Sequence, residues 1–324
     1  MKKSFIFVMQ NLYPILGGAE QSIVSLITQL RKRGHIVSYI CAENYSDDLL
    51  NTIEHHDILI TQLNWTATAT NKAEQFNKPS VIFIRSLENV CRKVYEDPKF
   101  LSMCEQQCKK CPHRITGYEE HGRALRKASL ILTNSKWTSK MFREEHNLQS
   151  EYIYPFIDFE YYSNIELKER KYIAMNKWSW PDGTEIFLDI AQRMPKQQFK
   201  IVGYEAVHSN RPLPLNVKYT GVSEDAQEIY GDVKVWLYPN LHGTFGRVAI
   251  EAQLAGIPVI GAARGPVLED KMTPYTVKDY RNPAAWKKEI LNIIKTNKQP
   301  MTDFSAFQIE NQVNKFIKLT EGLS

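Results

Sequence analysis

The sequence is poor in cysteine and has no long apolar run: of its 324 residues, 5 are Cys, 15 are Gly and 15 are Pro. So few cysteines exclude a small disulfide-stapled fold, and the modest Gly and Pro content excludes a collagen-like or low-complexity chain. Apolar stretches such as residues 5–9 fall far short of the roughly 20 residues that span a bilayer. This run ends at Gln10, before the roughly 7 to 15 apolar residues of a signal-peptide core. We therefore expect no transmembrane helix and a cytoplasmic protein.

Charge of one sign is not dominant, because 41 Lys and Arg face 36 Asp and Glu, for a net charge of +5. Most of the surplus falls in residues 1–155, with short basic clusters at 31–33 and 123–127. No aromatic-basic RNA-binding motif or zinc-finger spacing accompanies them, so nucleic acid is not an expected partner. The clusters form either a solvated face or a surface that meets phosphate-bearing substrates or anionic lipid head groups.

What the sequence does contain is a repeated alternation of strand and helix patterns. Short apolar, β-prone runs predict strands at residues 5–9, 36–41, 58–60, 81–84 and 130–133, and then at 172–175, 199–203, 217–220, 233–238 and 258–261. Apolar strands separated by helices predict parallel sheets covered on both faces. We expect an α/β protein with a first domain at 1–155, a second at 156–303 and a C-terminal helix at 304–324.

Paired glycines, Gly17 and Gly18, join the first predicted strand to the first predicted helix. Such a pair lets the backbone approach a ligand, and the helix N-terminus behind it offers free N–H groups to an anion. A simple tight turn explains the pair equally well. Its position favours a ligand, because open α/β sheets bind ligands at the carboxyl ends of their strands.

A second candidate segment, residues 238–260, contains Glu251 in an otherwise apolar helix. A buried carboxylate is unfavourable unless hydroxyls, amides or a cation satisfy it. A ribose diol would do so through two charge-assisted hydrogen bonds. The alternative is a glutamate that forms a salt bridge at the edge of a helix.

This segment resembles the signature of the retaining, nucleotide-sugar-dependent glycosyltransferases of the GT-B fold, the glycosyl transferases group 1. The matching residues are Phe245, Gly246, Glu251, Ala252, Gly256, Pro258 and Val259. Further similarities occur at residues 17–20, 133–138, 154–158 and 264–269, so the resemblance covers nearly the whole chain. It implies two Rossmann-like parallel-sheet domains facing a central cleft, with the C-terminal helix crossing back to the first domain.

The resemblance also implies an enzyme of polysaccharide biosynthesis that transfers a hexose-type unit, with retention, from a UDP- or GDP-sugar to a glycan, glycolipid or lipid-linked acceptor at the inner face of the membrane. It assigns donor binding to Gly17, Gly18, Lys177, Gly203, Thr244, Phe245, Gly246, Arg247 and Glu251. It assigns catalytic roles to Arg85, Lys177 and Glu251. A generic arginine at the end of a strand explains Arg85 equally well. No cofactor is required in this family, because helix ends and basic side chains neutralise the leaving diphosphate.

Two departures from the family pattern bear on turnover. Gly243 stands where the family has the first glutamate of its pair, and the two phosphate-binding cations of the family align with Lys177 and Asp182. Either the donor is unusual, or the chain is a turnover-deficient subunit that binds sugar nucleotide, glycan or a partner transferase. A Rossmann oxidoreductase is a third reading, but the chain lacks a G-x-G-x-x-G opening.

Four of the five cysteines gather in a short insert at residues 91–113. They are Cys91, Cys104, Cys108 and Cys111, with the spacing C-x12-C-x3-C-x2-C. In a reducing compartment this spacing favours a structural zinc over disulfides. Free thiols and a redox-labile disulfide are the alternatives. The insert belongs to the acceptor-side domain, where it would shape the acceptor site rather than take part in catalysis.

Overall fold

The computed structural model describes residues 2–12, 17–87, 90–91, 119–179, 182–207, 211–298 and 303–323. The chain divides into two compact units. Unit 1 is formed by the described residues of 2–157 together with 305–323, and unit 2 by those of 158–304. The chain therefore passes from unit 1 to unit 2 after Ile157, two residues beyond the expected position, and returns to unit 1 at Ser305.

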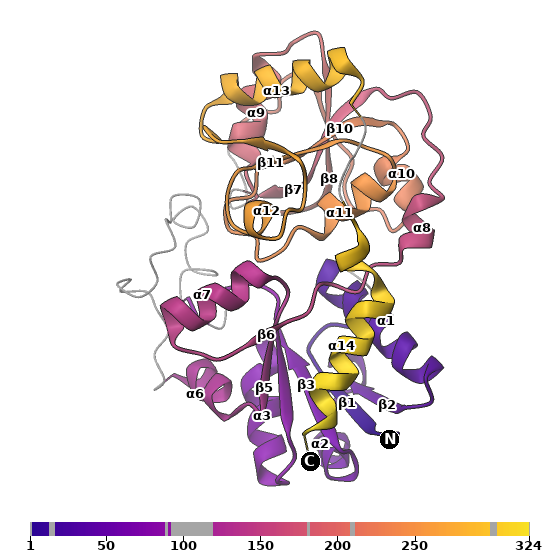
Figure 1. Cartoon of the computed structure of the whole chain (residues 1–324), viewed down its shortest axis with the longest axis vertical. Helices are drawn as coiled ribbons and strands as arrows, with labels where there is room; N and C mark the ends of the chain where they lie inside the picture. Colours follow the sequence, from indigo (N-terminus) through magenta and orange to yellow (C-terminus); the bar gives the residue numbers. More distant parts are fainter. Residues whose placement is uncertain are drawn as a thin grey trace. The chain divides into compact units, whose positions relative to one another are not determined.

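Within its described residues, unit 1 is built on a six-stranded parallel sheet in the order β2-β1-β3-β4-β5-β6 (Figure 1). The strands are β1 (Ser4–Val8), β2 (Ile36–Ile40), β3 (Ile58–Gln62), β4 (Ser80–Ile84), β5 (Leu130–Thr133) and β6 (Glu151–Tyr152). The chain order reverses between β1 and β3, so the carboxyl ends of these two strands form the topological switch point at which open α/β sheets bind ligands.

Helices precede and follow these strands in unit 1. They are α1 (Gly18–Lys32), α2 (Asp47–Asn51), α3 (Thr66–Gln75), α6 (Glu120–Lys127), α7 (Lys136–His146) and α14 (Ile309–Glu321). Short 3-10 turns lie at Ala42–Asn44, Thr52–His55, Leu63–Trp65 and Ser305–Phe307. The C-terminal segment expected to be one helix from residue 304 is thus a 3-10 turn followed by α14.

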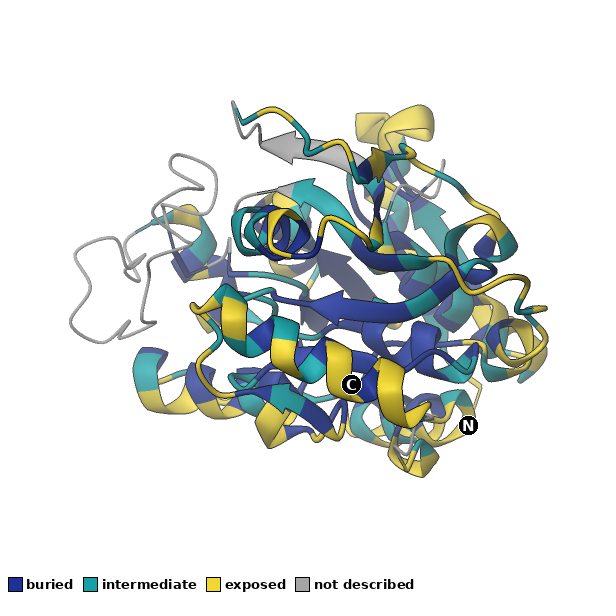
Figure 2. Ribbon diagram, turned by 90° about the horizontal axis from the view of Figure 1, so that it is seen from above, coloured by how far each residue is buried: buried dark blue, intermediate teal, exposed yellow. Residues whose placement is uncertain are grey.

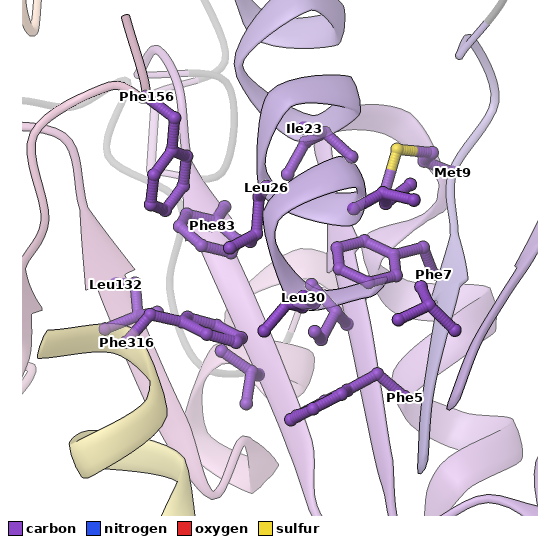
Figure 3. Packing of buried hydrophobic residues seen from close by; sticks show 14 of the residues in the cluster. Phe5, Phe7, Met9, Ile23, Leu26, Leu30, Phe83, Leu132, Phe156 and Phe316 are labelled. Carbon is purple, nitrogen blue, oxygen red and sulfur yellow. The ribbon is translucent and has the colours of Figure 1, made fainter. Parts of the chain in front are cut away.

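Helix α14 completes the core of unit 1 on the face covered by α1. Phe316 of α14 stacks on Phe83 of β4 with ring centroids 6.0 Å apart, and it also meets Phe5 of β1 (Figure 3). The Lys3 ammonium donates to the carbonyl oxygens of Thr320 and Leu323, at 2.9 and 2.7 Å. The last turn of α14 is therefore fixed to the start of β1, as expected for a helix that crosses back to the first unit.

The described part of unit 2 is built on a second six-stranded parallel sheet, in the order β12-β11-β10-β7-β8-β9. Its strands are β7 (Tyr172–Ser179), β8 (Gln198–Val207), β9 (Val217–Tyr219), β10 (Val233–Tyr238), β11 (Val259–Ala262) and β12 (Tyr275–Val277). Read from the other edge, this is the Rossmann order, in which the first and fourth strands lie side by side. The switch point of unit 2 is therefore between β7 and β10.

The helices of unit 2 are α8 (Phe159–Ser163), α9 (Thr184–Gln192), α10 (Ala226–Tyr230), α11 (Arg247–Leu254), α12 (Pro266–Glu269) and α13 (Pro283–Thr296). Their inward faces and the central strands are buried, whereas their outward faces are exposed (Figure 2). Phe187 of α9 and Trp286 of α13 pack with Val235 and Leu237 of β10 in one apolar cluster. Burial of the sheet on both faces explains why its strands read as apolar runs in the sequence.

Candidate functional site

The loops that follow β7 and β10 touch at the switch point of unit 2. The Asn240 side-chain amide donates a hydrogen bond of 2.6 Å to the Asp182 carboxylate. Gly183 adopts a left-handed conformation with φ of +91°, and a Cβ atom there would lie 2.8 Å from Pro239. Only glycine satisfies both the conformation and the close approach. The two loops thus form one unit at the carboxyl ends of the central strands.

Three helices that begin at this edge of the sheet start at a glycine. The N-caps of α9, α11 and α12 are Gly183, Gly246 and Gly265, and no side chain among the described residues caps them. By contrast, α10 and α13 are capped by the side chains of Asp225 and Asn282. Uncapped N-terminal N–H groups attract anions, and phosphate groups bind well to such helix ends. The two longer helices, α9 and α11, leave these N–H groups beside the switch point.

Lys177 stands at a bulge near the end of β7. Its φ is +62°, and the register between β7 and β8 shifts between Asn176 and Trp178. A non-glycine residue in this conformation costs about 1–3 kcal/mol, and bulges commonly redirect a side chain beside an active site. Gly203 of β8, with φ of +107°, lies opposite this bulge, and a Cβ atom on Gly203 would be 3.4 Å from the backbone nitrogen of Lys177. The bulge therefore brings Lys177 and Gly203 together.

Glu251 lies on α11 and is only 5% exposed. One carboxylate oxygen accepts a 2.8 Å hydrogen bond from the Tyr230 hydroxyl, and the other is paired with the Arg247 guanidinium one turn earlier. Burial and the nearby Glu251 raise the pKa of Tyr230 well above its ordinary value. Burial alone would lower the pKa of Arg247, but Glu251 more than offsets it and the pKa is raised. The carboxylate and guanidinium thus form a buried ion pair.

The turn between β10 and α11 explains why Gly243 carries no side chain. A Cβ on Gly243 would collide with the Tyr238 hydroxyl and come within 3.4 Å of the Asn240 amide. The same hydroxyl donates to the Phe245 carbonyl oxygen at 3.2 Å. Thr244 and Gly246 are buried beside them. A glutamate at residue 243 would require this tyrosine to move.

His242 is a further polar residue of this turn and is not among the site residues predicted from the sequence. Its side chain is 8% exposed, and neither ring nitrogen has a hydrogen-bond partner among the described residues. Burial, together with Arg264 and Arg281, lowers the pKa of His242 to about 3. The ring is therefore neutral at neutral pH. The only signal in the sequence was its place directly before Gly243.

The predicted site residues of unit 1 lie at the carboxyl edge of its own sheet. Gly17 is the N-cap of α1 and Gly18 its first residue, and no described side chain caps this helix. The half-buried Arg85 follows β4, where its Nε donates to the Gln62 Oε1 atom at 2.8 Å and its guanidinium lies 4.6 Å from the Phe83 ring. A cavity of about 110 Å³ at the switch point is lined by Met9, Gln10, Asn11, Gln62, Leu63 and Asn64.

The described residues include one member of the cysteine cluster. Cys104, Cys108 and Cys111 lie outside the described residues, and Cys91 is buried at the end of the segment 90–91. Among the described residues there is no group of three or more His, Cys, Asp or Glu that could hold a metal ion. The described helices also include none with the length and apolar character needed to cross a bilayer. The fifth cysteine, Cys41, is buried directly after β2.

Comparison with known families supports the resemblance seen in the sequence. Residues 171–296, which lie within unit 2, match the family model of the glycosyl transferases group 1. The predicted family is therefore confirmed for this segment. No curated protein sequence matches the chain.

Solved structures with the same fold cover almost the entire chain. A glycosyltransferase from Rickettsia africae ESF-5 has a TM-score of 0.70 at 14% identity, covering 99% of this chain and 98% of that one. Sucrose-phosphate synthase from Thermosynechococcus elongatus has a TM-score of 0.69 at 15% identity, covering 99% and 98%. The catalytic domain of starch synthase IV from Arabidopsis thaliana, bound to ADP and acarbose, has a TM-score of 0.65 at 11% identity, covering 98% and 100%. The chain has the predicted GT-B fold.

Proposed function

We propose that the protein is a retaining glycosyltransferase that moves a sugar from a UDP- or GDP-sugar to a hydroxyl group of a glycan, glycolipid or lipid-linked acceptor. One observation carries the proposal: the segment that matches the glycosyl transferases group 1 contains every loop that gathers at the switch point of unit 2. The ADP bound to the starch synthase domain supports a nucleoside diphosphate as the shared part of the ligand.

In this proposal, Glu251 holds the ribose of the donor. An ionised carboxylate has about four acceptor positions, and Tyr230 and Arg247 occupy one on each oxygen. The remaining positions can accept the two ribose hydroxyl groups. The negative charge stays balanced by Arg247, so the nucleotide need not neutralise it.

The diphosphate would be bound by groups that supply positive charge without a metal ion. Backbone N–H groups of 244–247 and the Lys177 ammonium are the candidates in unit 2, with Gly203 allowing close approach. As the bond to the sugar breaks, these groups stabilise the charge that develops on the departing phosphate. The departing oxygen takes the proton of the acceptor hydroxyl, so we assign no protein nucleophile. Arg85 is proposed to bind a phosphate group of donor or acceptor.

A second candidate, a turnover-deficient subunit that binds sugar nucleotide, glycan or a partner transferase, is favoured by one observation. The Tyr238 hydroxyl occupies the space that a side chain at Gly243 would need, so the turn offers no carboxylate there. Purified protein incubated with radiolabelled UDP-, GDP- and ADP-sugars distinguishes the two candidates. Slow donor hydrolysis or transfer supports the enzyme. Binding without hydrolysis or transfer across a broad donor and acceptor panel supports the subunit, and no binding at all contradicts both.

We also propose that the protein works in the cytoplasm, in peripheral contact with the inner face of the membrane. Helix α6 buries Ala124 and Leu125 while exposing Arg123, Arg126 and Lys127. Basic side chains near anionic lipid each contribute about 1 kcal/mol. Co-sedimentation with vesicles containing phosphatidylserine, compared with purely zwitterionic vesicles, tests this contact. Equal recovery with both kinds of vesicle would contradict it.

A further inference from the structure

His242 is a buried polar side chain whose hydrogen-bonding capacity the described chain does not use. Both ring nitrogens are shielded from solvent and lack a partner among the described residues. Buried polar groups in native proteins are nearly always hydrogen-bonded, and an exception calls for an explanation. A ligand that supplies the missing partners is one such explanation.

The position of this side chain is fixed by the backbone around it. The Asn240 Oδ1 atom accepts hydrogen bonds from the backbone N–H groups of His242 and Gly243, at 2.8 and 2.6 Å. The Asn240 amide nitrogen in turn binds Asp182 in the loop after β7. His242 is therefore held at the switch point, beside the uncapped start of α11. Because Gly243 offers no side chain, the polar side chain directly before it in the turn, His242, is a candidate to contact a ligand.

The chemical state of the ring indicates the kind of group that it would bind. Burial and the positive charges of Arg264 and Arg281 keep the imidazole neutral, so it has one N–H donor and one lone-pair acceptor. A phosphate oxygen can only accept hydrogen bonds, so it would leave the lone pair unused. A pair of hydroxyl groups can both donate and accept, and thus satisfies both nitrogens.

We propose that His242 binds the sugar portion of the donor, accepting a hydrogen bond from one hydroxyl group of the sugar and donating one to another hydroxyl or ring substituent. The inference rests on the proposed function, because it takes the ligand of unit 2 to be a nucleotide sugar. It makes His242 a residue that recognises the transferred sugar and contributes nothing to the binding of the nucleoside diphosphate.

The experiment compares two affinities in each of four proteins. The proteins are the wild type, His242→Leu, His242→Asn and His146→Leu. For each of them, isothermal titration calorimetry measures the affinity for UDP, GDP and ADP. It then measures the affinity for the glucose and N-acetylglucosamine conjugates of each nucleotide. His146 is a matched control, since it is also a buried histidine but lies on α7 of unit 1. For the base that binds, His242→Leu should lower the affinity for the nucleotide sugar roughly tenfold, as expected for a buried hydrogen-bonding group left unpaired. The affinity for the matching diphosphate should be unchanged.

The other variants and outcomes keep the inference falsifiable. His242→Asn retains a donor and an acceptor and should recover part of the lost affinity, whereas His146→Leu should match the wild type. Unchanged nucleotide-sugar affinity in His242→Leu would overturn the inference, as would equal losses for the sugar conjugate and the diphosphate. The unchanged diphosphate affinity also shows that the variant is folded. If the wild type binds no nucleotide at all, the proposed function itself fails, which is a different result.

Discussion

The side-chain amide of Asn240 donates a 2.6 Å hydrogen bond to the carboxylate of Asp182 and so joins the loop after β10 to the loop after β7. This contact explains why Asp182 is acidic at a position where the family pattern has a phosphate-binding cation. The half-buried carboxylate serves as a hydrogen-bond acceptor for the neighbouring loop. In the proposed function, positive charge for the diphosphate therefore comes from Lys177 and from the uncapped N-terminus of α11.

Replacing Asn240 should disturb nucleotide-sugar binding more than replacing Asp182. Asn240→Ala removes the bond to Asp182 and both bonds to the backbone of the turn, so we expect a loss of about 1–3 kcal/mol of binding free energy. Asp182→Asn retains a carbonyl oxygen that can accept from Asn240, so its affinity should stay within about 0.5 kcal/mol of the wild type. Titration calorimetry with the nucleotide sugar that binds provides the comparison. A larger loss of binding free energy in Asp182→Asn than in Asn240→Ala would show that the negative charge of Asp182 itself contributes to binding.

The buried pair of Glu251 and Arg247 should make Glu251→Ala strongly destabilising. Removing one partner leaves the other charge buried without compensation, which typically costs about 3–5 kcal/mol. Replacing both residues by leucine removes this penalty, so the double variant should be more stable than Glu251→Ala. Urea denaturation monitored by circular dichroism measures the difference.

The ribose assignment is better tested by Glu251→Gln, which also leaves Arg247 without its counter-charge but, unlike alanine, opens no cavity and retains a carbonyl acceptor in nearly the same shape. We expect it to weaken nucleoside diphosphate binding by about 1–3 kcal/mol. Tyr230→Phe removes only the 2.8 Å hydrogen bond and serves as the control. If Glu251→Gln binds nucleotide as tightly as Tyr230→Phe and the wild type, Glu251 does not hold the ribose.

The neutral state of His242 should make the stability of unit 2 depend on pH. The pKa of His242 is lowered from 6.5 to about 3 in the folded protein. Above about pH 6.5 the ring is neutral in both states, and as the pH falls towards 3 only the unfolded chain takes up the proton, so stability is lost. Between pH 7 and pH 5 this amounts to about 2 kcal/mol. The wild type should therefore lose about that much more than His242→Leu over this interval. Urea titrations of both proteins at pH 7 and pH 5 measure these losses of stability. Equal losses in the wild type and in His242→Leu would show that the folded ring takes up a proton as readily as the unfolded chain does.

The cysteine cluster remains a proposal, because three of its four residues lie outside the described part of the chain. If Cys91, Cys104, Cys108 and Cys111 bind zinc as thiolates, anaerobically purified protein should contain about one zinc ion per chain. Replacing all four with serine should abolish the zinc content. Cys41→Ser provides the control, since Cys41 is a core residue of unit 1 and should leave the zinc unchanged. Folded wild-type protein without metal would contradict the proposal.

Phe316 should be among the residues on which the stability of unit 1 depends most. Its fully buried ring packs on Phe83 and Phe5, so Phe316→Ala should cost about 3–5 kcal/mol through lost burial and the cavity left behind. Lys318→Ala, two residues further along α14 on its exposed side, should change stability by less than about 0.5 kcal/mol. Thermal unfolding followed by circular dichroism compares the two. Similar melting temperatures would show that α14 is not part of the cooperative core.

The central strands β3, β4 and β10 could be predicted closely because each is a short apolar run buried on two faces, whereas β6 and β12 are not predicted. Residues 130–133 and 233–238 are predicted with the bounds that the structure has. Helix α3 is not predicted, because its Thr66–Thr70 stretch alternates threonine and alanine with the period of a strand. The two-residue strand β6 is too short to leave a pattern. Its pairing with β5 depends on contacts that a local pattern cannot reveal.

The candidate site could be predicted where the backbone dictates the residue type. Glycines at the starts of helices, and a carboxylate on an apolar helix, are visible in the sequence. The partners of Glu251 are less visible, since Tyr230 lies 21 residues earlier and its role arises only when α10 packs beside α11. The same holds for Asn240 and Asp182, which are 58 residues apart. Side chains whose function comes from distant partners require the fold to be known first.

Helix α14 also has a consequence for the order in which the protein can fold as it leaves the ribosome. Its residues are synthesised after all of unit 2, yet Val313 and Phe316 belong to the core of unit 1. During translation the sheet of unit 1 must wait with the part of its apolar face beside α1 uncovered, while unit 2, which is continuous in sequence from residue 158 to 304, can close first. The N-terminal half of the chain is therefore completed last, and the uncovered face is the surface that a chaperone would protect in the meantime.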